Sequence, residues 1–240
     1  MAGTAVLGRL TWRVADVAGV VEETPRTRTL VLDVEGWEGH RAGQHVDIRL
    51  TAEDGYQAER SYSIASGPDD PQFALTVERI DDGEVSPYLV DEVRPGDAFE
   101  LRGPIGGYFA WDPADGGPLL LVGGGSGVVP LRSMLRARPR DIPARLVYSA
   151  RTLDSVIYRE ELEALGNDVV VTLTRERRDG VRAGRADAAL LREVGFGPEL
   201  EPRVFVCGPT SFVESVASAL VELGHAPERI RTERFGPTGR

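Results

Sequence analysis

Two patterns of hydrophobic positions divide the 240-residue chain. In the first half, short segments alternate between apolar and polar residues and are rich in β-branched side chains, with Gly, Pro and Asp clusters between them. Alternation with a period of two is typical of half-buried strands, so these segments predict an antiparallel β-barrel or sandwich. Between the last two segments, residues 84–93 carry apolar side chains at helical spacing and predict a short helix. The predicted strands are residues 9–24, 27–35, 43–50, 59–66, 71–80 and 97–103.

The second half changes to nearly unbroken Val- and Leu-rich strands that alternate with amphipathic helices. Such strands are buried on both faces, and their alternation with helices predicts a parallel sheet with right-handed crossovers. The change falls in a stretch rich in Pro, Gly and Asp, residues 111–118, so we place two domains at residues 1–112 and 113–240. The predicted strands are residues 118–124, 144–150, 168–174, 202–208 and 229–235, and the helices are 127–138, 158–166, 185–195 and 210–224.

Charge and composition exclude several classes of function. The net charge of −10 argues against a general nucleic-acid binder, which needs a basic surface. The single cysteine, Cys207, excludes an internal disulfide and a cysteine-ligated metal or iron–sulfur centre. The histidines lack the close spacing of metal ligands, so we expect no metal site and interpret His40 and His45 as structural.

Neither a signal peptide nor a membrane span is indicated by the hydrophobic pattern. Polar residues interrupt the N-terminal segment, and no stretch reaches the roughly 18 apolar residues that a membrane helix needs. We therefore expect a cytoplasmic protein with no membrane partner.

A glycine-rich turn joins the first buried strand of the second half to its helix. The sequence "LLLVGGGSGVVPL", residues 119–131, places Gly124, Gly125, Ser126 and Gly127 between the two elements. Free backbone N–H groups at a helix N-terminus stabilise an anion such as a pyrophosphate. The turn lacks the Lys-Ser/Thr pair of a P-loop, which argues against triphosphate hydrolysis, and Val128 replaces the third glycine of the dinucleotide fingerprint. A turn without a ligand remains possible on this pattern alone.

Arginines follow the next strands of the predicted sheet. Where an NAD site commonly has an acidic residue, this chain has Ser149 and Arg151, and Arg175 and Arg185 come after later strands. The carboxyl ends of parallel strands lie at one sheet edge, so these four side chains can converge there. Arginines and a hydroxyl suit the 2′-phosphate of NADPH, although three ordinary surface arginines would give the same spacing.

The first half contains a strand of mixed chemistry, "RSYSIAS", residues 60–66. The pleat of a strand places Arg60 and Tyr62 on one face and Ser61 and Ser63 on the other. A flavin needs an aromatic surface, a polar group near its redox-active nitrogen and cations for its phosphates, which this strand offers. Taken alone, an ordinary barrel strand explains the segment equally well.

Seven motifs in order resemble the ferredoxin–NADP reductase superfamily of FAD-dependent oxidoreductases. They are "RSYS", "GEVSPYL", "RPGD", "GPIGGYF", "LVGGGSGVVP", "YSART" and "VFVCGPTSFV", and the resemblance runs from about residue 8 to residue 236. It implies an FAD-binding, Greek-key antiparallel β-barrel followed by a nicotinamide-dinucleotide-binding α/β domain.

The resemblance also implies roles for individual residues. Arg60 would contact the FAD phosphates, Tyr62 and Phe235 would cover the flavin ring, and Ser63 would lie near its redox-active nitrogen. Cys207, with Gly208 and Pro209, would lie beside the nicotinamide, and Glu233 near the hydride path, so Ser63, Cys207 and Glu233 are the candidate catalytic residues. The other implied cofactor-binding residues are Ser61, Val77, Gly83, Val85, Ser86, Gly124, Gly125, Ser126, Gly127, Ser149, Arg151, Arg175 and Arg185.

The predicted activity is hydride transfer from NADPH to FAD, followed by delivery of electrons to a separate acceptor such as a ferredoxin, a flavodoxin or an oxygenase component. NADH remains open, because "YxxR" also occurs in relatives that use NADH. The chain shows neither a four-cysteine ferredoxin domain nor a globin, so we expect a stand-alone, monomeric reductase. The alternatives are a free-flavin or quinone reductase and an FAD-binding regulatory subunit of a larger complex.

Overall fold

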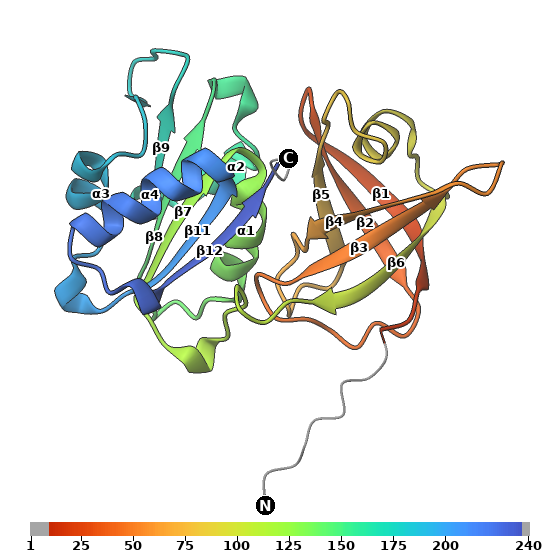
Figure 1. Ribbon diagram of the computed structural model, residues 1–240, viewed down its shortest axis with the longest axis horizontal. Coiled ribbons are helices and arrows are strands. Elements are labelled where there is room, and N and C mark those ends of the chain that lie inside the picture. Colours follow the sequence, from red (N-terminus) through yellow and green to blue (C-terminus); the bar gives the residue numbers. More distant parts are fainter. Residues whose placement is uncertain (1–9, 237–240) are drawn as a thin grey trace, which may run out of the picture.

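Two bodies of different architecture lie side by side (Figure 1). The computed structural model describes residues 10–236, apart from the side chain of Asn167. The N-terminal half of the chain forms a sheet of crossing strands, and the C-terminal half forms a sheet covered by helices. The two-domain fold class predicted from the sequence is confirmed.

The N-terminal sheet has six antiparallel strands in the order β4-β3-β6-β1-β2-β5. A bridge between Ile64 and Leu75 joins the two ends of this order and closes the barrel. The last strand returns to lie between β1 and β3, as in a Greek key. Side chains alternate along the strands, and the inward ones, such as Leu30, Ile48 and Leu101, are fully buried. The strands are β1 (Arg13–Thr24), β2 (Thr27–Val34), β3 (His45–Thr51), β4 (Gln57–Ser63), β5 (Phe73–Glu78) and β6 (Ala98–Ile105).

The short helix predicted after β5 is present as a π-helical turn, Tyr88–Glu92. Its apolar residues Leu89 and Val90 are buried against the barrel core, while Tyr88 is partly exposed. The apolar spacing therefore identified which side chains of this segment point inward.

The C-terminal sheet is parallel, with the strand order β10-β9-β8-β7-β11-β12. Helices α1 and α2 pack on the face toward the barrel, and α3 and α4 pack on the other face. The sequence pattern missed β10, which is only two residues long. The strands are β7 (Leu119–Gly124), β8 (Ala144–Ala150), β9 (Val169–Leu173), β10 (Arg182–Ala183), β11 (Arg203–Pro209) and β12 (Ile230–Phe235). The helices are α1 (Val128–Ala137), α2 (Arg159–Ala164), α3 (Ala188–Val194) and α4 (Thr210–Glu222).

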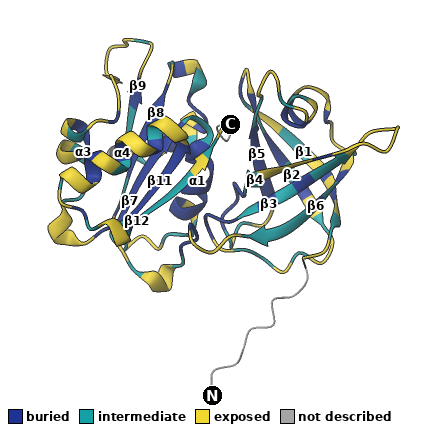
Figure 2. Cartoon of the chain, in the orientation of Figure 1, coloured by how far each residue is buried: buried dark blue, intermediate teal, exposed yellow. Residues whose placement is uncertain are grey.

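A continuous apolar core connects the two bodies. The cluster around α1 and β7 includes barrel-side residues, among them Ala65, Phe109 and Trp111. In Figure 2, buried segments of both bodies, coloured dark blue, lie where the bodies meet. The ring of Phe109 meets Phe205 of β11 edge-on, with centroids 5.4 Å apart. Apolar packing of this kind holds the domains in one arrangement, so residues from both halves can form one site.

None of the helices in residues 10–236 combines the length and the apolar character needed to cross a bilayer.

Candidate functional site

The glycine turn lies directly against the strand that carries Cys207. One 3-10 turn, Gly125–Gly127, joins β7 to α1, and Gly125 has a φ of +57°, which favours glycine. A Cβ on Gly127 would overlap the main-chain carbonyl of Cys207, and one on Gly124 would lie 2.9 Å from the Phe212 ring. The turn therefore needs glycine to bring the N-terminus of α1 close to β11. No side chain caps the start of α1, where Val128 N donates to Gly125 O and Ser126 O and Pro130 has no N–H. The other main-chain amides of the turn would receive an anion beside Cys207, and that role stays a prediction.

Cys207 is a buried thiol rather than a nucleophile. Its side chain is 2% exposed, and burial raises its pKa well above the ordinary value, with a further contribution from the nearby Glu233 charge. Cys207 is paired in register with Glu233 on the neighbouring strand β12. A neutral thiol at this position can position a ligand ring but cannot attack it.

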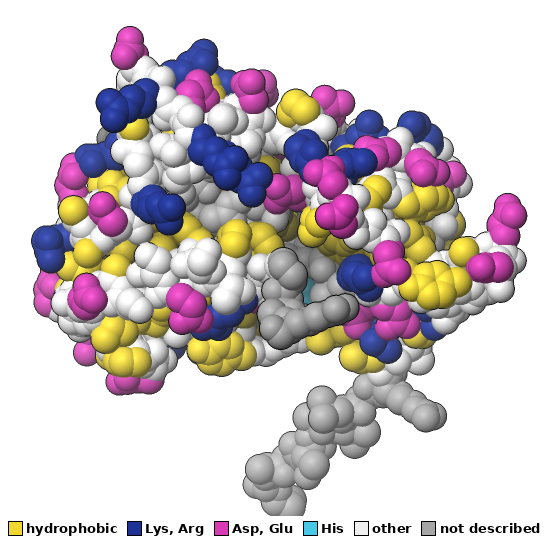
Figure 3. Space-filling model, turned by 45° about the horizontal axis from the view of Figure 1, so that its top comes forward, with side chains coloured by type: hydrophobic (Ala, Val, Ile, Leu, Met, Phe, Trp, Pro, Cys, Tyr) yellow, Lys and Arg dark blue, Asp and Glu magenta, His cyan; other side chains and the backbone are white. Residues whose placement is uncertain are grey.

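The predicted arginines follow the carboxyl ends of three neighbouring strands. Arg151 comes after β8, Arg175 after β9 and Arg185 after β10. The main chains are joined there, because Arg175 N donates to Arg151 O at 2.9 Å. Within residues 10–236, none of these three exposed guanidinium groups pairs with a carboxylate, which leaves them available to an anion. The chain has no lysine, so the dark blue side chains over the α/β domain in Figure 3 are all arginines.

Strand β4 presents its side chains as the alternation predicts. Arg60 and Tyr62 are paired in register with the buried residues Ile48 and Val46 of β3, whereas the Ser61 hydroxyl donates to Asp47 at 2.6 Å. Tyr62 packs against the barrel core, and burial raises the pKa of its hydroxyl. A neutral phenol on a half-buried ring is a suitable surface for stacking.

Arg60 is not free. Its Nη2 lies 2.5 Å from Glu84 Oε2, and Glu84 Oε1 accepts a hydrogen bond from Tyr56 Oη at 2.8 Å. The Arg60–Glu84 pair is half exposed. Any phosphate that binds Arg60 therefore competes with Glu84, a feature that the sequence motif did not indicate.

The remaining barrel candidates offer mainly backbone groups. Val77 and Val85 are fully buried in the barrel core, so only their main-chain atoms can reach a ligand. The Ser86 hydroxyl accepts from Ile80 N at 3.0 Å, which leaves its own hydrogen free to donate. A Cβ on Gly83 would lie 2.9 Å from Ser86 Oγ, so glycine keeps this turn tight. These groups can bind a phosphate, and that role stays a prediction.

Ser63, Cys207 and Glu233 lie around the seam, the boundary between the domains where β3 of the barrel meets β12. Ser63 is paired in register with His45 of β3, and His45 Nδ1 lies 3.9 Å from Glu233 Oε1. Phe235 follows on β12, opposite Pro209, and packs against the core between the domains. His45 was interpreted as structural, because no local pattern in the sequence shows that β12 lies against β3.

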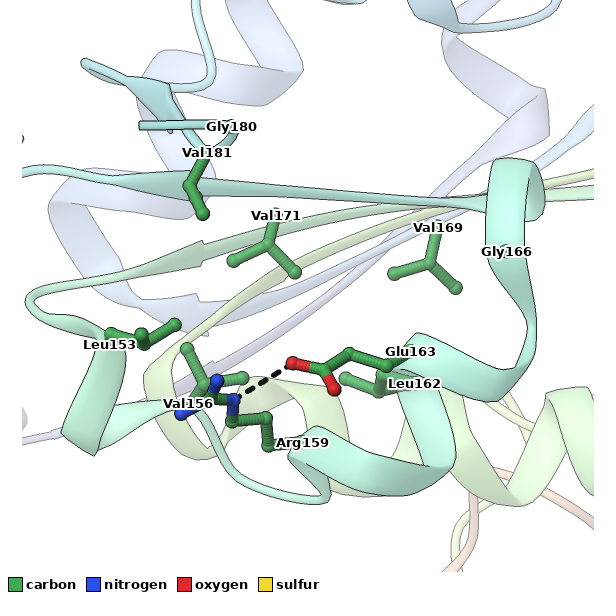
Figure 4. Close-up of a pocket in the computed structure, with 10 residues that line it drawn as sticks. All are labelled: Leu153, Val156, Arg159, Leu162, Glu163, Gly166, Val169, Val171, Gly180 and Val181. Atoms are coloured by element: carbon green, nitrogen blue, oxygen red, sulfur yellow. Dashed lines mark hydrogen bonds and ion pairs between the residues drawn. The ribbon is translucent and has the colours of Figure 1, made fainter. Parts of the chain in front are cut away.

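A cavity between α2 and β9 lies away from these residues (Figure 4). It measures about 280 Å³ and is formed by α2 and β9, with Val169 and Val171 pointing into it. An ion pair between Arg159 and Glu163, 2.8 Å apart, lies on the α2 side. None of the predicted site residues lines this cavity.

Comparison with known proteins finds one family model in each half of the chain. Residues 16–110 match the family model "Oxidoreductase FAD-binding domain", and residues 121–218 match "Oxidoreductase NAD-binding domain". A ferredoxin–NADP reductase B of Sorangium cellulosum is 39% identical over 211 residues, which cover 81% of this chain and 84% of that protein. The chain belongs to the ferredoxin–NADP reductase superfamily. The resemblance noted in the sequence is confirmed, and FAD and a nicotinamide dinucleotide are its cofactors.

Other members of the superfamily are longer than this chain. A glycine betaine monooxygenase reductase subunit of Chromohalobacter salexigens is 34% identical over 236 residues, which cover 91% of this chain but 63% of that protein. The solved cytochrome P450 reductase GcoB of Amycolatopsis matches with a TM-score of 0.84 and 28% identity, covering 98% of this chain and 74% of that chain. This chain therefore corresponds to the flavin and nicotinamide part of such reductases.

The residues present fit both cofactors. The glycine turn leaves space where any larger side chain would meet β11, and no side chain caps the adjoining helix N-terminus, which suits a pyrophosphate. On the barrel, Arg60 and the segment from Gly83 to Ser86 supply a cation, amides and a hydroxyl. The assignment of each residue to a particular cofactor atom stays a prediction.

Proposed function

We propose that this protein takes a hydride from NADPH by means of bound FAD and passes electrons to a separate carrier such as a ferredoxin, a flavodoxin or an oxygenase component. The relatives named as a ferredoxin–NADP reductase and a monooxygenase reductase subunit favour such an acceptor. The observation that supports NADPH over NADH is the set of three arginines without carboxylate partners, in the described chain, at the carboxyl ends of β8, β9 and β10.

In the proposed mechanism the two cofactors supply the hydride chemistry and the chain supplies binding and orientation. Arg60 and the Gly83–Ser86 segment would hold the FAD phosphates, and Tyr62 and Phe235 would cover the flavin ring. Gly124 to Gly127 would hold the nicotinamide dinucleotide pyrophosphate, while Cys207, Gly208 and Pro209 would position its ring. Ser63 would donate a hydrogen bond at the seam. The apolar core between the domains would exclude water from this region.

The 2′-phosphate of NADPH would be bound by Ser149, Arg151, Arg175 and Arg185. A hydrogen bond to a charged group is worth about 1.5–3 kcal/mol, so we expect Arg175→Ala or Arg185→Ala to raise the KM for NADPH roughly tenfold or more. The KM for NADH should change little, because NADH has no phosphate there. Arg177→Ala, an exposed arginine on the same loop, is the matched control and should leave both constants unchanged.

The test begins with the purified protein and its absorption spectrum. We expect a flavin spectrum that NADPH bleaches faster than NADH in the absence of oxygen, and flavin that stays bound through gel filtration. A colourless protein that takes up no FAD would contradict the proposed function. Faster bleaching by NADH, or arginine variants that impair both nucleotides equally, would contradict the NADPH preference. Flavin that is lost readily would instead favour the free-flavin reductase.

We also propose that the protein acts as a monomer in the cytoplasm. Light scattering with the purified protein measures the first, and fractionation of cells measures the second. A stable dimer at micromolar concentration would contradict the monomer.

A further inference from the structure

One carboxylate of the barrel, Glu78, faces the glycine turn of the α/β domain. Ala74, Thr76 and Glu78 share the outer face of β5, because side chains alternate along a strand. Ala74 belongs to the apolar core between the domains, and Thr76 accepts a hydrogen bond from Tyr158 of the α/β domain at 2.5 Å. The face of β5 that carries Glu78 is therefore the face that meets the α/β domain.

The end of this face lies at the glycine turn itself. Strand β5 contacts the turn Gly125–Gly127, and Glu78 Oε2 lies 3.8 Å from the position that a Cβ on Gly125 would take. Tyr148 of β8 is a second neighbour, since burial raises the pKa of its hydroxyl and the charge of Glu78 contributes in the same direction. The carboxylate thus borders the place where the main-chain amides of the turn would receive a pyrophosphate.

Glu78 has no ion-pair partner among residues 10–236, and its side chain is half-buried. The neighbouring Arg79 pairs with Asp91 at 2.7 Å and also with Asp81. Arg26 pairs with Asp81 too, at 3.0 Å. An unpaired carboxylate beside an anion site repels the anion, because like charges interact unfavourably over several ångströms where water is partly excluded.

We propose that Glu78 lowers the affinity of the glycine turn for the pyrophosphate of the nicotinamide dinucleotide, and that it thereby speeds the departure of the oxidised nucleotide after hydride transfer. The repulsion raises the free energy of the bound state and acts on NADPH and NADP⁺ alike, so it changes mainly the dissociation rate. Looser binding raises the KM for NADPH but shortens the time for which the product occupies the site. Glu78 is thus an affinity-determining residue, and this role rests on the proposed function.

Glu78 and the three arginines after β8, β9 and β10 act on different parts of the nucleotide. The arginines would bind the 2′-phosphate, which only NADPH carries, whereas NADPH and NADH share the pyrophosphate. Glu78 therefore changes the affinity for both nucleotides by a similar factor and leaves the preference between them unchanged. Its role can be tested whichever nucleotide is the electron donor.

The first test measures the binding of NADP⁺ and NAD⁺ to the FAD-loaded protein by isothermal titration calorimetry. We expect Glu78→Gln to lower both Kd values roughly three- to tenfold, and salt to reduce this gain because it screens the repulsion. Glu78→Asp retains the charge and should stay close to the native protein, whereas Glu78→Arg should bind more tightly than Glu78→Gln. Asp33→Asn is the matched control, because Asp33 is exposed and lies at the end of β2 away from Glu78. It removes one negative charge as well and should leave both Kd values unchanged.

The second test follows steady-state turnover with ferricyanide as the one-electron acceptor. We expect Glu78→Gln to lower the KM for NADPH and the inhibition constant of NADP⁺ by similar factors, while bleaching of the flavin at saturating NADPH keeps its native rate. A role of Glu78 in packing alone would give no salt dependence and would not separate Glu78→Asp from Glu78→Gln.

Several outcomes would overturn the role of Glu78. They are unchanged or weaker nucleotide binding in Glu78→Gln, a gain that persists at high salt, and an equal gain in Asp33→Asn. Each of these leaves the native protein binding FAD and nucleotide, so the proposed function would stand. A native protein that takes up no FAD, or that binds neither NADP⁺ nor NAD⁺, would instead contradict the proposed function together with the role of Glu78.

Discussion

Glu84 shows how one side chain can set the affinity of a cofactor site. Its carboxylate holds the Arg60 guanidinium at 2.5 Å and accepts from Tyr56 at 2.8 Å. These contacts lower the pKa of Glu84, the Tyr56 bond first and Arg60 second. The arginine is held in one orientation, but the carboxylate occupies the position toward which a phosphate would be drawn. Glu84 therefore competes with an anionic ligand for Arg60.

We predict that Glu84→Gln binds FAD more tightly than the native protein. An exposed ion pair contributes little, so the expected gain is only roughly two- to fivefold. Quenching of flavin fluorescence on titration of the apoprotein measures the affinity, and raising the salt concentration should reduce the difference. Glu53→Gln is the control, since Glu53 is exposed and, in the described chain, forms no ion pair. Equal gains in both variants, or weaker binding in Glu84→Gln, would contradict the prediction.

Among the helices, strands and turns, the tightest approach near the predicted nucleotide site is between the glycine turn and β11. The turn places Gly127 against the Cys207 carbonyl, so the N-terminus of α1 and the end of β11 approach more closely than any Cβ would allow. This contact brings the glycine turn and the Cys207–Pro209 segment together. In the proposed function, positioning of the nucleotide would therefore depend on two main chains rather than on side chains.

We predict that Gly127→Ala weakens both the fold and nucleotide binding. The added methyl group must displace β11 or α1, at a cost of about 1–3 kcal/mol in the free energy of unfolding. Urea unfolding measures the stability, and the KM for NADPH should rise because Cys207 and the turn move apart. Ser126→Ala, in the same turn, is the control and should change the stability by less than about 0.5 kcal/mol. A Gly127→Ala protein with native stability and KM would show that the contact is not tight.

The elements were predictable because their signals are local. Alternation identified the six barrel strands, and unbroken apolar runs identified five strands of the parallel sheet. Strand β10 was missed, because a strand of two residues is too short to show a repeating hydrophobic pattern. The seam was not predictable, because β3 and β12 are almost 200 positions apart and meet only through the packing of the two domains. For the same reason, the sequence did not indicate that Glu84 pairs with Arg60 or that His45 faces Glu233.

Over the whole molecule, polar contacts fix the domain arrangement on one side of the apolar core. Tyr158 Oη donates to Thr76 Oγ1 at 2.5 Å, Ser133 Oγ donates to Ser66 O at 2.7 Å, and Arg136 binds Asp70 through two nitrogens. Tyr158 accepts a left-handed φ of +58°, and its ring is also covered by Arg132. Glu233 differs from these groups, because its Oε2 atom is buried at the same boundary and has no hydrogen-bond partner among residues 10–236.

This difference predicts how the stability of the whole molecule depends on pH. The folded-state pKa of Glu233 is about 7, above the ordinary value of 4.5, so between pH 4.5 and 7 the folded protein holds a proton that the unfolded chain has released. Its stabilising contribution is therefore complete below pH 4.5 and is lost as the pH rises through 7. We predict that Glu233→Gln equals the native protein in free energy of unfolding near pH 4.5 and exceeds it at pH 8 by at most about 3 kcal/mol.

The lowered pKa values of His40, His45 and His225 oppose folding in acid, but they are present in both proteins and largely cancel in the difference. Urea unfolding at a series of pH values measures this difference, and Glu222→Gln, at an exposed position on α4, should give a difference that does not change with pH. A Glu233→Gln difference that is flat from pH 4.5 to 8 would show that the carboxyl is already ionised in the folded protein at acid pH.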